Sequence, residues 1–239
     1  MNDNNNVTVV SGYWRVKGKY SSEIFEKWFD NTLRINCPYV FFGDEESIEI
    51  VKKIRQYLPT YYIKLEMNEF YTYKYKNNVC YMLPHVPSTE VNLIWNEKIN
   101  LVERAKEIDP YKSNYFMWID AGIYNYRNKK PSIKQFPDPD KIKLLPIDKF
   151  IFCTTDSGNF EKYKVHENNY YHYISGNFII PKNIVNTFAE LYRTYIDKYL
   201  SQYNWLNTEQ KILTHIYNDK PELFYQYSVG YGSIVKELE

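Results

Sequence analysis

Short apolar runs alternate with stretches of helical spacing along the first part of the chain. Runs rich in β-branched and aromatic residues predict strands, and these lie at residues 7–14, 38–43 and 61–66. Between the strands, apolar residues recur every three or four positions, which predicts amphipathic helices over residues 22–33 and 48–58. Strands that alternate with helices in this way favour a parallel sheet covered on both faces.

The rest of the chain continues with longer helices and less regular connections. Residues 69–90 hold prolines and show no steady period, which predicts an irregular excursion. Residues 163–180 predict two short strands or a ribbon around a turn near Asn168. Further strands are predicted at 115–119 and 150–155, and further helices at 92–107, 183–203 and 207–217.

The pattern predicts one domain with a largely aromatic core. Neither an internal repeat nor a linker divides the sequence, so we expect a single domain over residues 1–239, with a flexible N-terminus at residues 1–6. Hydrophobic residues make up 44% of the chain, enough for a sizeable core, and 26 Tyr and 13 Phe supply much of that apolar surface. Their rings pack, while the phenolic hydroxyls remain available for hydrogen bonds at the edges.

The net charge, the hydropathy and the cysteines of the sequence indicate which partners and which compartment to expect. The net charge is +1 and no long basic run occurs, so nothing supports a nucleic-acid partner. No stretch approaches the roughly 20 apolar residues that span a bilayer, and the N-terminus lacks the features of a signal peptide. Cys37, Cys80 and Cys153 are scattered and odd in number, which is typical of a reduced protein without disulfides or a zinc site. We therefore expect a cytoplasmic or otherwise intracellular protein.

A single carboxylate ends one strongly apolar run. In NYFMWIDAGIY (residues 114–124), Asp120 follows the predicted strand directly, and Ala121 and Gly122 come next. Small residues let a bulky ligand approach the backbone, and a carboxylate at a strand end can hold a divalent cation that neutralises a diphosphate. The simpler interpretation is an aspartate that only caps a turn. The pattern alone leaves both open.

Several segments together resemble a known family. YFMWIDAGI resembles the acidic strand end of nucleotide-sugar glycosyltransferases with the GT-A fold, in which a hydrophobic strand ends in Asp-x-Asp. From end to end, the chain also resembles the HtrL/YibB-like family, which is itself similar to GT-A glycosyltransferases. The matching segments, in chain order, are VVSGYWR, EIFEKWFDN, IWNEKINLVERAKEIDPYKS, FMWIDAGIY, ISGNFII and NTEQKILTHIYNDKPELF.

This resemblance implies a fold and an activity. The fold is a single GT-A-like (Rossmann-like) α/β domain, with a mixed, mostly parallel sheet flanked by helices. The activity is that of a soluble glycosyltransferase, which moves a sugar from a nucleoside-diphosphate sugar, a UDP-sugar in the first place, to a hydroxyl of a glycan or protein acceptor. A non-catalytic carbohydrate- or protein-binding module, or a nucleotide-sugar hydrolase, would share the fold, so both remain alternatives.

The resemblance also bears on a metal ion. Asp120 matches the first acid of Asp-x-Asp, but Gly122 stands where the second acid would be, which removes one potential ligand. Either Mn²⁺ or Mg²⁺ binds through Asp120, waters and the donor diphosphate, or the reaction proceeds without a metal. In the second case basic side chains must compensate the charge of the departing nucleoside diphosphate.

Two basic residues are the first candidates for that task. Arg15 follows the first strand end, where donor nucleotides lie in this fold, and its planar fork suits phosphate oxygens. Lys98 belongs to a Trp-x-x-Lys pattern on the helix that leads into the acidic strand. Lys17, Lys19 and Arg127 are further candidates. For each of them the alternative is a solvated surface charge.

The segment NTEQ (residues 207–210) supports two interpretations that are compatible. Asn207 and Gln210 have the spacing of a helix capping box, with Glu209 near the positive end of the helix. In the glycosyltransferase resemblance, an Asp/Glu-Gln pair at such a place lies at the reaction centre. Glu209 would then deprotonate an acceptor hydroxyl, or stabilise the sugar as positive charge develops.

The remaining candidates also follow from the resemblance. ISGNFII resembles the segment beside the donor sugar, with Gly176 allowing close approach and Ser175 or Asn177 hydrogen-bonding sugar hydroxyls; the alternative is a turn into a strand. His215 is either a late metal ligand or a residue packed in the last helix. Asp44 is a candidate for the nucleoside, or else the N-cap of a helix.

Overall fold

A single mixed sheet organises the molecule. The structure is a computed structural model, and it describes residues 6–79, 86–156, 158–163, 172–204 and 206–239. These residues form a 7-stranded sheet with the order β3-β2-β1-β4-β6-β5-β7. The strands are β1 (Val7–Tyr13), β2 (Tyr39–Gly43), β3 (Thr60–Lys64), β4 (Tyr115–Trp118), β5 (Phe150–Thr154), β6 (Ile174–Pro181) and β7 (Phe224–Ser228).

One strand, β6, runs in the opposite direction to the other strands of the sheet. Strands β3, β2, β1 and β4 are mutually parallel. Strand β6 runs antiparallel to both of its neighbours, β4 and β5, and β7 is parallel to β5. Since Trp118 at the end of β4 pairs with Phe178, the residues of β6 that precede Phe178 lie beside Asp120.

Helices and short 3₁₀ helices connect these strands. The α-helices are α1 (Ser22–Thr32), α2 (Glu45–Arg55), α3 (Thr89–Ile108), α4 (Pro139–Ile142), α5 (Val185–Tyr203), α6 (Glu209–Asp219) and α7 (Ser233–Leu238). The 3₁₀ helices are η1 (Met67–Glu69), η2 (Tyr71–Tyr75), η3 (Tyr124–Tyr126), η4 (Phe160–Tyr163), η5 (Lys182–Ile184) and η6 (Pro221–Leu223). None of the helices over the described residues is long and apolar enough to cross a membrane.

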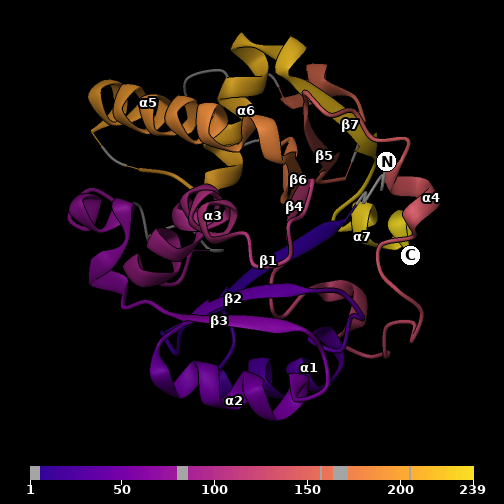
Figure 1. Ribbon diagram of the computed structural model, residues 1–239. Coiled ribbons are helices and arrows are strands. Elements are labelled where there is room, and N and C mark those ends of the chain that lie inside the picture. Colours follow the sequence, from indigo (N-terminus) through magenta and orange to yellow (C-terminus); the bar gives the residue numbers. More distant parts are fainter. Residues whose placement is uncertain (1–5, 80–85, 157, 164–171, 205) are drawn as a thin grey trace.

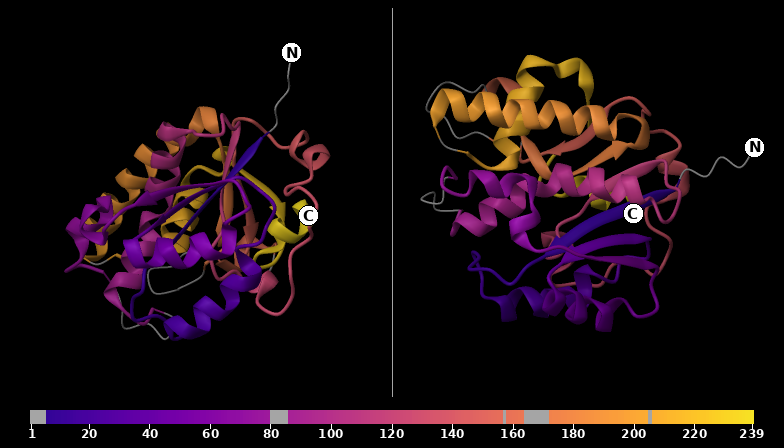
Figure 2. Two further views of the ribbon diagram at one scale, coloured as in Figure 1. Left: turned by 60° about the horizontal axis from the view of Figure 1, so that its bottom comes forward. Right: turned by 60° about the vertical axis from the view of Figure 1, so that its left-hand side comes forward.

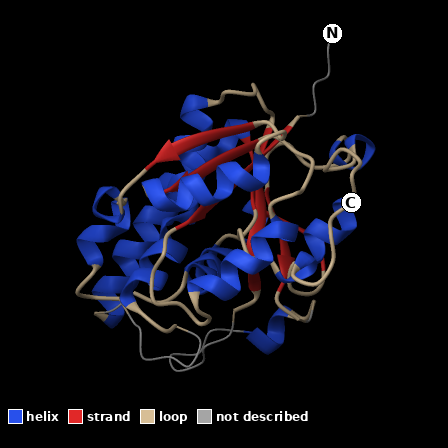
Figure 3. Ribbon diagram, turned by 90° about the horizontal axis from the view of Figure 1, so that it is seen from below, coloured by secondary structure: helices blue, strands red, loops and turns tan. Residues whose placement is uncertain are grey.

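Both faces of the sheet carry a core. Successive residues of a strand point to opposite faces. Val10 and Trp118 therefore pack with α3, α5 and α6, whereas Val9 and Met117 pack with α1, α2 and α7. Figure 1 and the right-hand view of Figure 2 show α5 and α6 (orange) on one side of the strands and α1 and α2 (indigo) on the other. Seen from below, the strands lie among the helices (Figure 3).

The structure confirms the single sheet flanked by helices and most of the predicted elements. It also adds β7 and α7, which the sequence pattern did not predict. The turn expected near Asn168 lies outside the described residues, and of the ribbon expected around it the structure describes β6. The capping box expected between Asn207 and Gln210 is wrong. Thr208, and not Asn207, is the N-cap of α6. The Asn207 side-chain oxygen accepts from the Thr208 amide and the Gln210 side chain donates to the carbonyl of Ile174, so neither forms a capping-box bond.

Candidate active site

A cleft of about 650 Å³ opens at the carboxyl ends of β1 and β4. Here the strand order reverses: the chain builds β2 and β3 on one side of β1 and then crosses by α3 to β4 on the other side. Such a switch point leaves a crevice between the two connections that follow the strands. The cleft is lined by Gly12 and Tyr13 of β1, Asp120 after β4, Gly176 of β6 and Glu209 of α6.

A buried ion-paired cluster forms the floor of this cleft. The Lys98 ammonium from α3 donates to Oε1 of Glu209 at 2.8 Å and lies 2.9 Å from Oδ1 of Asp120. The carbonyl oxygen of Gly176 lies 3.4 Å from the same nitrogen. The Lys98 and Glu209 side chains are each 3% exposed and that of Asp120 is 29% exposed, so Asp120 is the member that faces solvent.

Burial and charge act on the cluster in opposite directions. Burial raises the pKa of the Glu209 carboxyl above its ordinary value, and the Lys98 ammonium offsets only part of that shift. Burial alone would lower the pKa of Lys98, but the neighbouring carboxylates of Asp120 and Glu209 raise it above its ordinary value. Lys98 therefore keeps its charge, and that charge is engaged by two carboxylates.

Asp120 does more than close a turn. The turn after β4 is closed by the backbone, since the amide of Ile123 donates to the carbonyl of Asp120 at 3.0 Å. The carboxylate instead accepts from the indole nitrogen of Trp118 at 2.8 Å on the Oδ1 atom that also faces Lys98. The Asp120 amide donates to Asn177 at 3.2 Å. Asp120 is thus oriented from both sides, towards the cleft.

Glu209 retains an oxygen without a partner. Its Oε2 atom is buried and has no hydrogen-bond partner among the described residues, although Oε1 is held by Lys98. A buried carboxylate oxygen without a donor is costly in a folded protein. An incoming hydroxyl group would satisfy it.

Position 176 must be a glycine for the Lys98–Asp120–Glu209 cluster to pack as it does. A Cβ at this position would lie 3.0 Å from the Lys98 nitrogen, 3.1 Å from Oε1 of Glu209 and 3.8 Å from Oδ2 of Asp120. Ser175 and Asn177 are buried on the opposite face of β6 and do not line the cleft. Of the three residues expected beside the donor sugar, the structure places Gly176 in the cleft.

The residues around Asp120 do not form a ligand set for a divalent cation. One oxygen of Asp120 already accepts from Lys98 and Trp118. At Gly122, where a second acid would stand, a Cβ would lie 3.0 Å from the Phe25 ring, so the Phe25 side chain would have to shift to admit an acidic residue. Within the described ranges, no three His, Cys, Asp or Glu residues are grouped so that they could hold a metal ion.

Three further sequence candidates lie outside the cleft. Arg15 is exposed and forms ion pairs with Glu26 and Glu46. His215 packs against Tyr199, with ring centroids 5.3 Å apart, and burial lowers its pKa to about 4. Asp44 is the N-cap of α2 and accepts from the backbone of that helix; this confirms the capping interpretation.

Tyr231 is a cleft residue that sequence reasoning missed. It lies between β7 and α7, flanked by Gly230 (φ 105°) and Gly232 (φ 70°), whose backbone conformations favour glycine. The residue is 47% exposed, yet burial raises the pKa of its hydroxyl and the nearby Asp120 adds to that shift. Tyr231 lines the cleft together with Asp120. Its only sequence signal is the short motif GYG.

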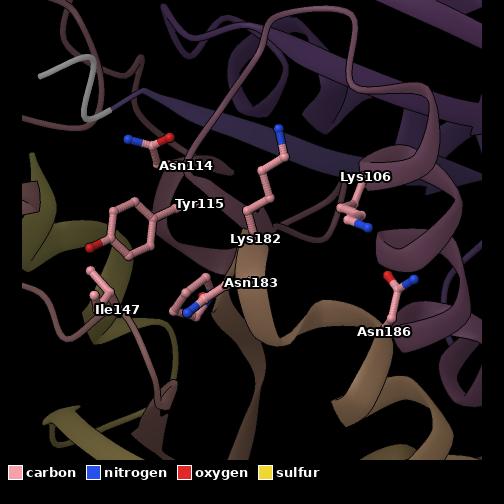
Figure 4. A pocket seen from close by; sticks show the side chains of 8 residues that line it. Lys106, Asn114, Tyr115, Ile147, Lys182, Asn183 and Asn186 are labelled. Carbon is pink, nitrogen blue, oxygen red and sulfur yellow. The ribbon is translucent and has the colours of Figure 1, made fainter. Parts of the chain in front are cut away.

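A second hollow of about 710 Å³ lies at the opposite end of β4. Figure 4 shows Lys106, Asn114, Lys182 and Asn183 around it. Lys182 is paired with Asp109, and none of the described residues that line this hollow is an Asp or a Glu. The ionised groups suited to chemistry lie in the cleft at the carboxyl ends.

Comparison of the fold with solved structures identifies its class. Mouse xyloside xylosyltransferase 1 in its apo form superposes with a TM-score of 0.55 at 11% identity, over 92% of this chain and 84% of that one. An active-site mutant of the galactosyltransferase LgtC gives a TM-score of 0.51 at 8% identity, over 94% of this chain and 72% of that one. The fold is therefore that of GT-A-like glycosyltransferases.

The sequence itself identifies the family. Residues 65–234 match the family described as bacterial protein of unknown function (HtrL_YibB). The chain belongs to this HtrL/YibB family, as the sequence predicts. No curated protein matches the sequence.

Proposed function

We propose that the protein is a glycosyltransferase that moves a sugar from a nucleoside-diphosphate sugar, in the first place a UDP-sugar, to an acceptor hydroxyl. The observation that carries the proposal is the Lys98–Asp120–Glu209 cluster, which lies in a cleft at the switch point of a GT-A-like sheet. A glycan or a protein would supply the acceptor hydroxyl.

The residues have distinct tasks in this proposal. In the transfer, the bond between the anomeric carbon and the diphosphate oxygen breaks, and its electron pair leaves with the nucleoside diphosphate. The acceptor oxygen bonds to the anomeric carbon, and its proton passes to Glu209. The raised pKa of Glu209 and its unpartnered Oε2 suit this task. Asp120 binds hydroxyls of the donor, and Lys98 holds both carboxylates in place.

Donor binding and donor hydrolysis test the proposal. Calorimetric titration with UDP, UDP-glucose, UDP-galactose and UDP-N-acetylglucosamine, each with and without Mn²⁺, should reveal a bound nucleotide sugar, and slow hydrolysis should release the free sugar. Asp120→Ala should abolish turnover, whereas Asp30→Ala, at an exposed position of α1, should not. If no nucleotide sugar binds under either condition, the proposal is wrong.

A non-catalytic carbohydrate-binding function is the second candidate. The observation in its favour is the aromatic lining of the cleft, which includes Tyr13, Tyr20, Phe25, Trp95 and Tyr124, because aromatic faces pack well against sugar rings. Binding of glycans without binding of nucleotides would favour this function. Release of sugar from the donor at a rate that no acceptor increases would instead indicate a nucleotide-sugar hydrolase.

A further inference from the structure

Binding of a nucleoside diphosphate in the cleft requires positive charge that the Lys98–Asp120–Glu209 cluster does not supply. A nucleoside diphosphate brings two negatively charged phosphoryl groups. On the cleft floor the single ammonium of Lys98 already faces the carboxylates of Asp120 and Glu209. Like charges near each other disfavour binding, so a positive group that is not already engaged must receive the diphosphate.

Arg127 is such a group, and it is held in place for binding. Its Nε donates to the carbonyl oxygen of Gly122 at 2.9 Å. The guanidinium carbon lies 3.7 Å from the ring centroid of Trp28, so the fork is stacked on the indole. No described residue accepts a hydrogen bond from either Nη group of Arg127, and the side chain lines the cleft. The two free Nη groups form a preoriented fork for anionic oxygens.

The other arginines differ from Arg127 in this respect. Each of them uses at least one Nη group within the protein: Arg15 with Glu26 and Glu46, Arg34 with Asp30, Arg55 with Leu33, Ile35 and Cys37, Arg104 with Glu69, and Arg193 with Glu103. Among the arginines, Arg127 in the cleft is therefore the one whose two Nη groups donate to no described residue.

Lys19 adds a second cation at the same place. It is exposed, lines the cleft, and forms no ion pair among the described residues. Its ammonium lies 5.9 Å from the centroid of the Tyr20 ring, and the Arg127 guanidinium carbon lies 5.5 Å from the same centroid. The two cations thus border one aromatic ring at the rim of the cleft.

We propose that Arg127 and Lys19 form the subsite for the diphosphate of the donor. This inference rests on the proposed function and names the group that binds the charged part of its substrate. The guanidinium fork receives phosphoryl oxygens, and Lys19 balances the remaining charge as the bond to the sugar breaks and the electron pair moves to the diphosphate oxygen. The sugar then points to Asp120 and Glu209 on the cleft floor.

The position of Gly122 supports this assignment. In Asp-x-Asp the second acid would help to place a metal against the diphosphate. In this chain the same position carries no acid and packs closely against Phe25, and its backbone carbonyl accepts from Arg127. The turn that presents Asp120 therefore also fixes a guanidinium near the site.

Calorimetric titration with UDP in the presence of EDTA tests the subsite. Arg127→Gln should weaken UDP binding about tenfold or more, and Lys19→Gln should weaken it less, since an exposed ammonium is screened by solvent. Both variants should also show a smaller loss of affinity with added salt than the wild type. The matched controls are Lys17→Gln, at an exposed position near Lys19, and Arg15→Gln, whose side chain is paired with glutamates; both should bind UDP like the wild type.

The outcomes separate this inference from the proposed function. If Arg127→Gln and Lys19→Gln bind UDP like the wild type, or if the controls lose as much affinity, the subsite is wrong while the proposed function stands. If the wild type binds no nucleotide, with or without Mn²⁺, both fall. Lys19→Gln alters only an exposed side chain, so the test remains decisive even if Arg127→Gln fails to fold. Arg127→Lys, which keeps the charge but loses the fork, should fall between Arg127→Gln and the wild type.

Discussion

Lys98 is a buried ammonium whose two partners come from distant parts of the chain. Asp120 follows β4, and Glu209 opens α6, 111 residues beyond Lys98 in the sequence. An ion pair in such a place is weak evidence for stability, because desolvation of the charges offsets their attraction. The ion pairs instead fix the geometry of the site, because one nitrogen, that of Lys98, holds two carboxylates on the cleft floor. Removal of the Lys98 ammonium nevertheless leaves the buried Glu209 carboxylate without a compensating charge.

Lys98→Met is therefore expected to destabilise the protein by about 3–5 kcal/mol, the usual effect of breaking a buried pair from one side. Urea unfolding at neutral pH measures this change. Lys106→Met, at a partly exposed position of the same helix, is the control and should change the unfolding free energy by less than about 0.5 kcal/mol. The double variant Lys98→Met/Glu209→Gln should recover part of the loss. Equal midpoints for Lys98→Met and its control would contradict the account.

Glu209→Gln is expected to alter the pH dependence of stability. Burial raises the pKa of Glu209 above its ordinary value of 4.5. The folded protein then binds this proton more tightly than the unfolded chain does. The resulting stabilisation is fully present below the unfolded pKa and is lost as the pH rises through the folded pKa. Since glutamine does not titrate, the variant should match the wild type near pH 4 and be the more stable protein near pH 7, while it loses transferase activity.

The measurement is a pair of urea titrations, one at each pH, for the variant and the wild type. Glu237→Gln, at an exposed position of α7, serves as the control and should follow the wild type at both values. A Glu209→Gln protein that is less stable than the wild type near pH 7 would show that the Lys98 attraction outweighs burial, and would refute the upward pKa shift.

At the scale of elements, the spacing of apolar residues predicted those strands and helices whose formation depends mainly on neighbouring residues in the sequence. The alternation up to β3 and the strand that precedes Asp120 follow from apolar runs and helical spacing, and the structure confirms them. Strand β7 escaped prediction because it is a short edge strand with Tyr225 and Gln226 exposed, and α7 is too short to show a period. Membership of the candidate site depends on pairings that no spacing reveals. Glu26 of α1 and Glu46 of α2 engage Arg15 outside the cleft, whereas Glu209 of α6 meets Lys98 of α3 inside it.

The turn between β7 and α7 yields the element-scale prediction. A Cβ on Gly232 would overlap the Asn125 side-chain oxygen, and Asn125 itself donates to the Gly232 carbonyl. Gly232→Ala should therefore displace the turn and with it Tyr231, in addition to about 1–3 kcal/mol of backbone strain at positive φ. We expect UDP affinity to fall about tenfold, as measured by calorimetry.

A compensating variant separates the overlap from the strain. Asn125→Ala removes the side chain that an alanine at position 232 would meet, so the double variant Asn125→Ala/Gly232→Ala should bind UDP more tightly than Gly232→Ala alone. If the double variant binds no better, the turn does not position Tyr231 through Asn125.

At the scale of the whole molecule, the two ends of the parallel strands have different tasks. The carboxyl ends of β1 and β4 carry the cleft. Near the amino end of β2, the buried side chain of Arg55 donates to the carbonyl oxygens of Leu33, Ile35 and Cys37 and stacks 3.6 Å from the ring centroid of Tyr39. These carbonyls belong to the connection from α1 to β2. The Ile35 carbonyl also accepts from the Cys37 amide at 2.9 Å, whereas no described backbone amide is seen to donate to the carbonyls of Leu33 and Cys37. Arg55 thus ties α2 to the loop that sets the register of β2.

Arg55→Met should consequently lower the unfolding free energy of the protein without changing its affinity for UDP. Loss of charged hydrogen bonds to buried carbonyl groups should lower the unfolding free energy by roughly 3 kcal/mol. The cleft lies at the other end of the sheet, so UDP affinity, measured well below the melting temperature, should stay within about twofold of the wild type. Lys53→Met, at an exposed position of α2, controls for the loss of a charge and should change neither quantity. A folded Arg55→Met protein that no longer binds UDP would mean that the two ends of the sheet are coupled, and the assignment of stability to one end and chemistry to the other would have to be abandoned.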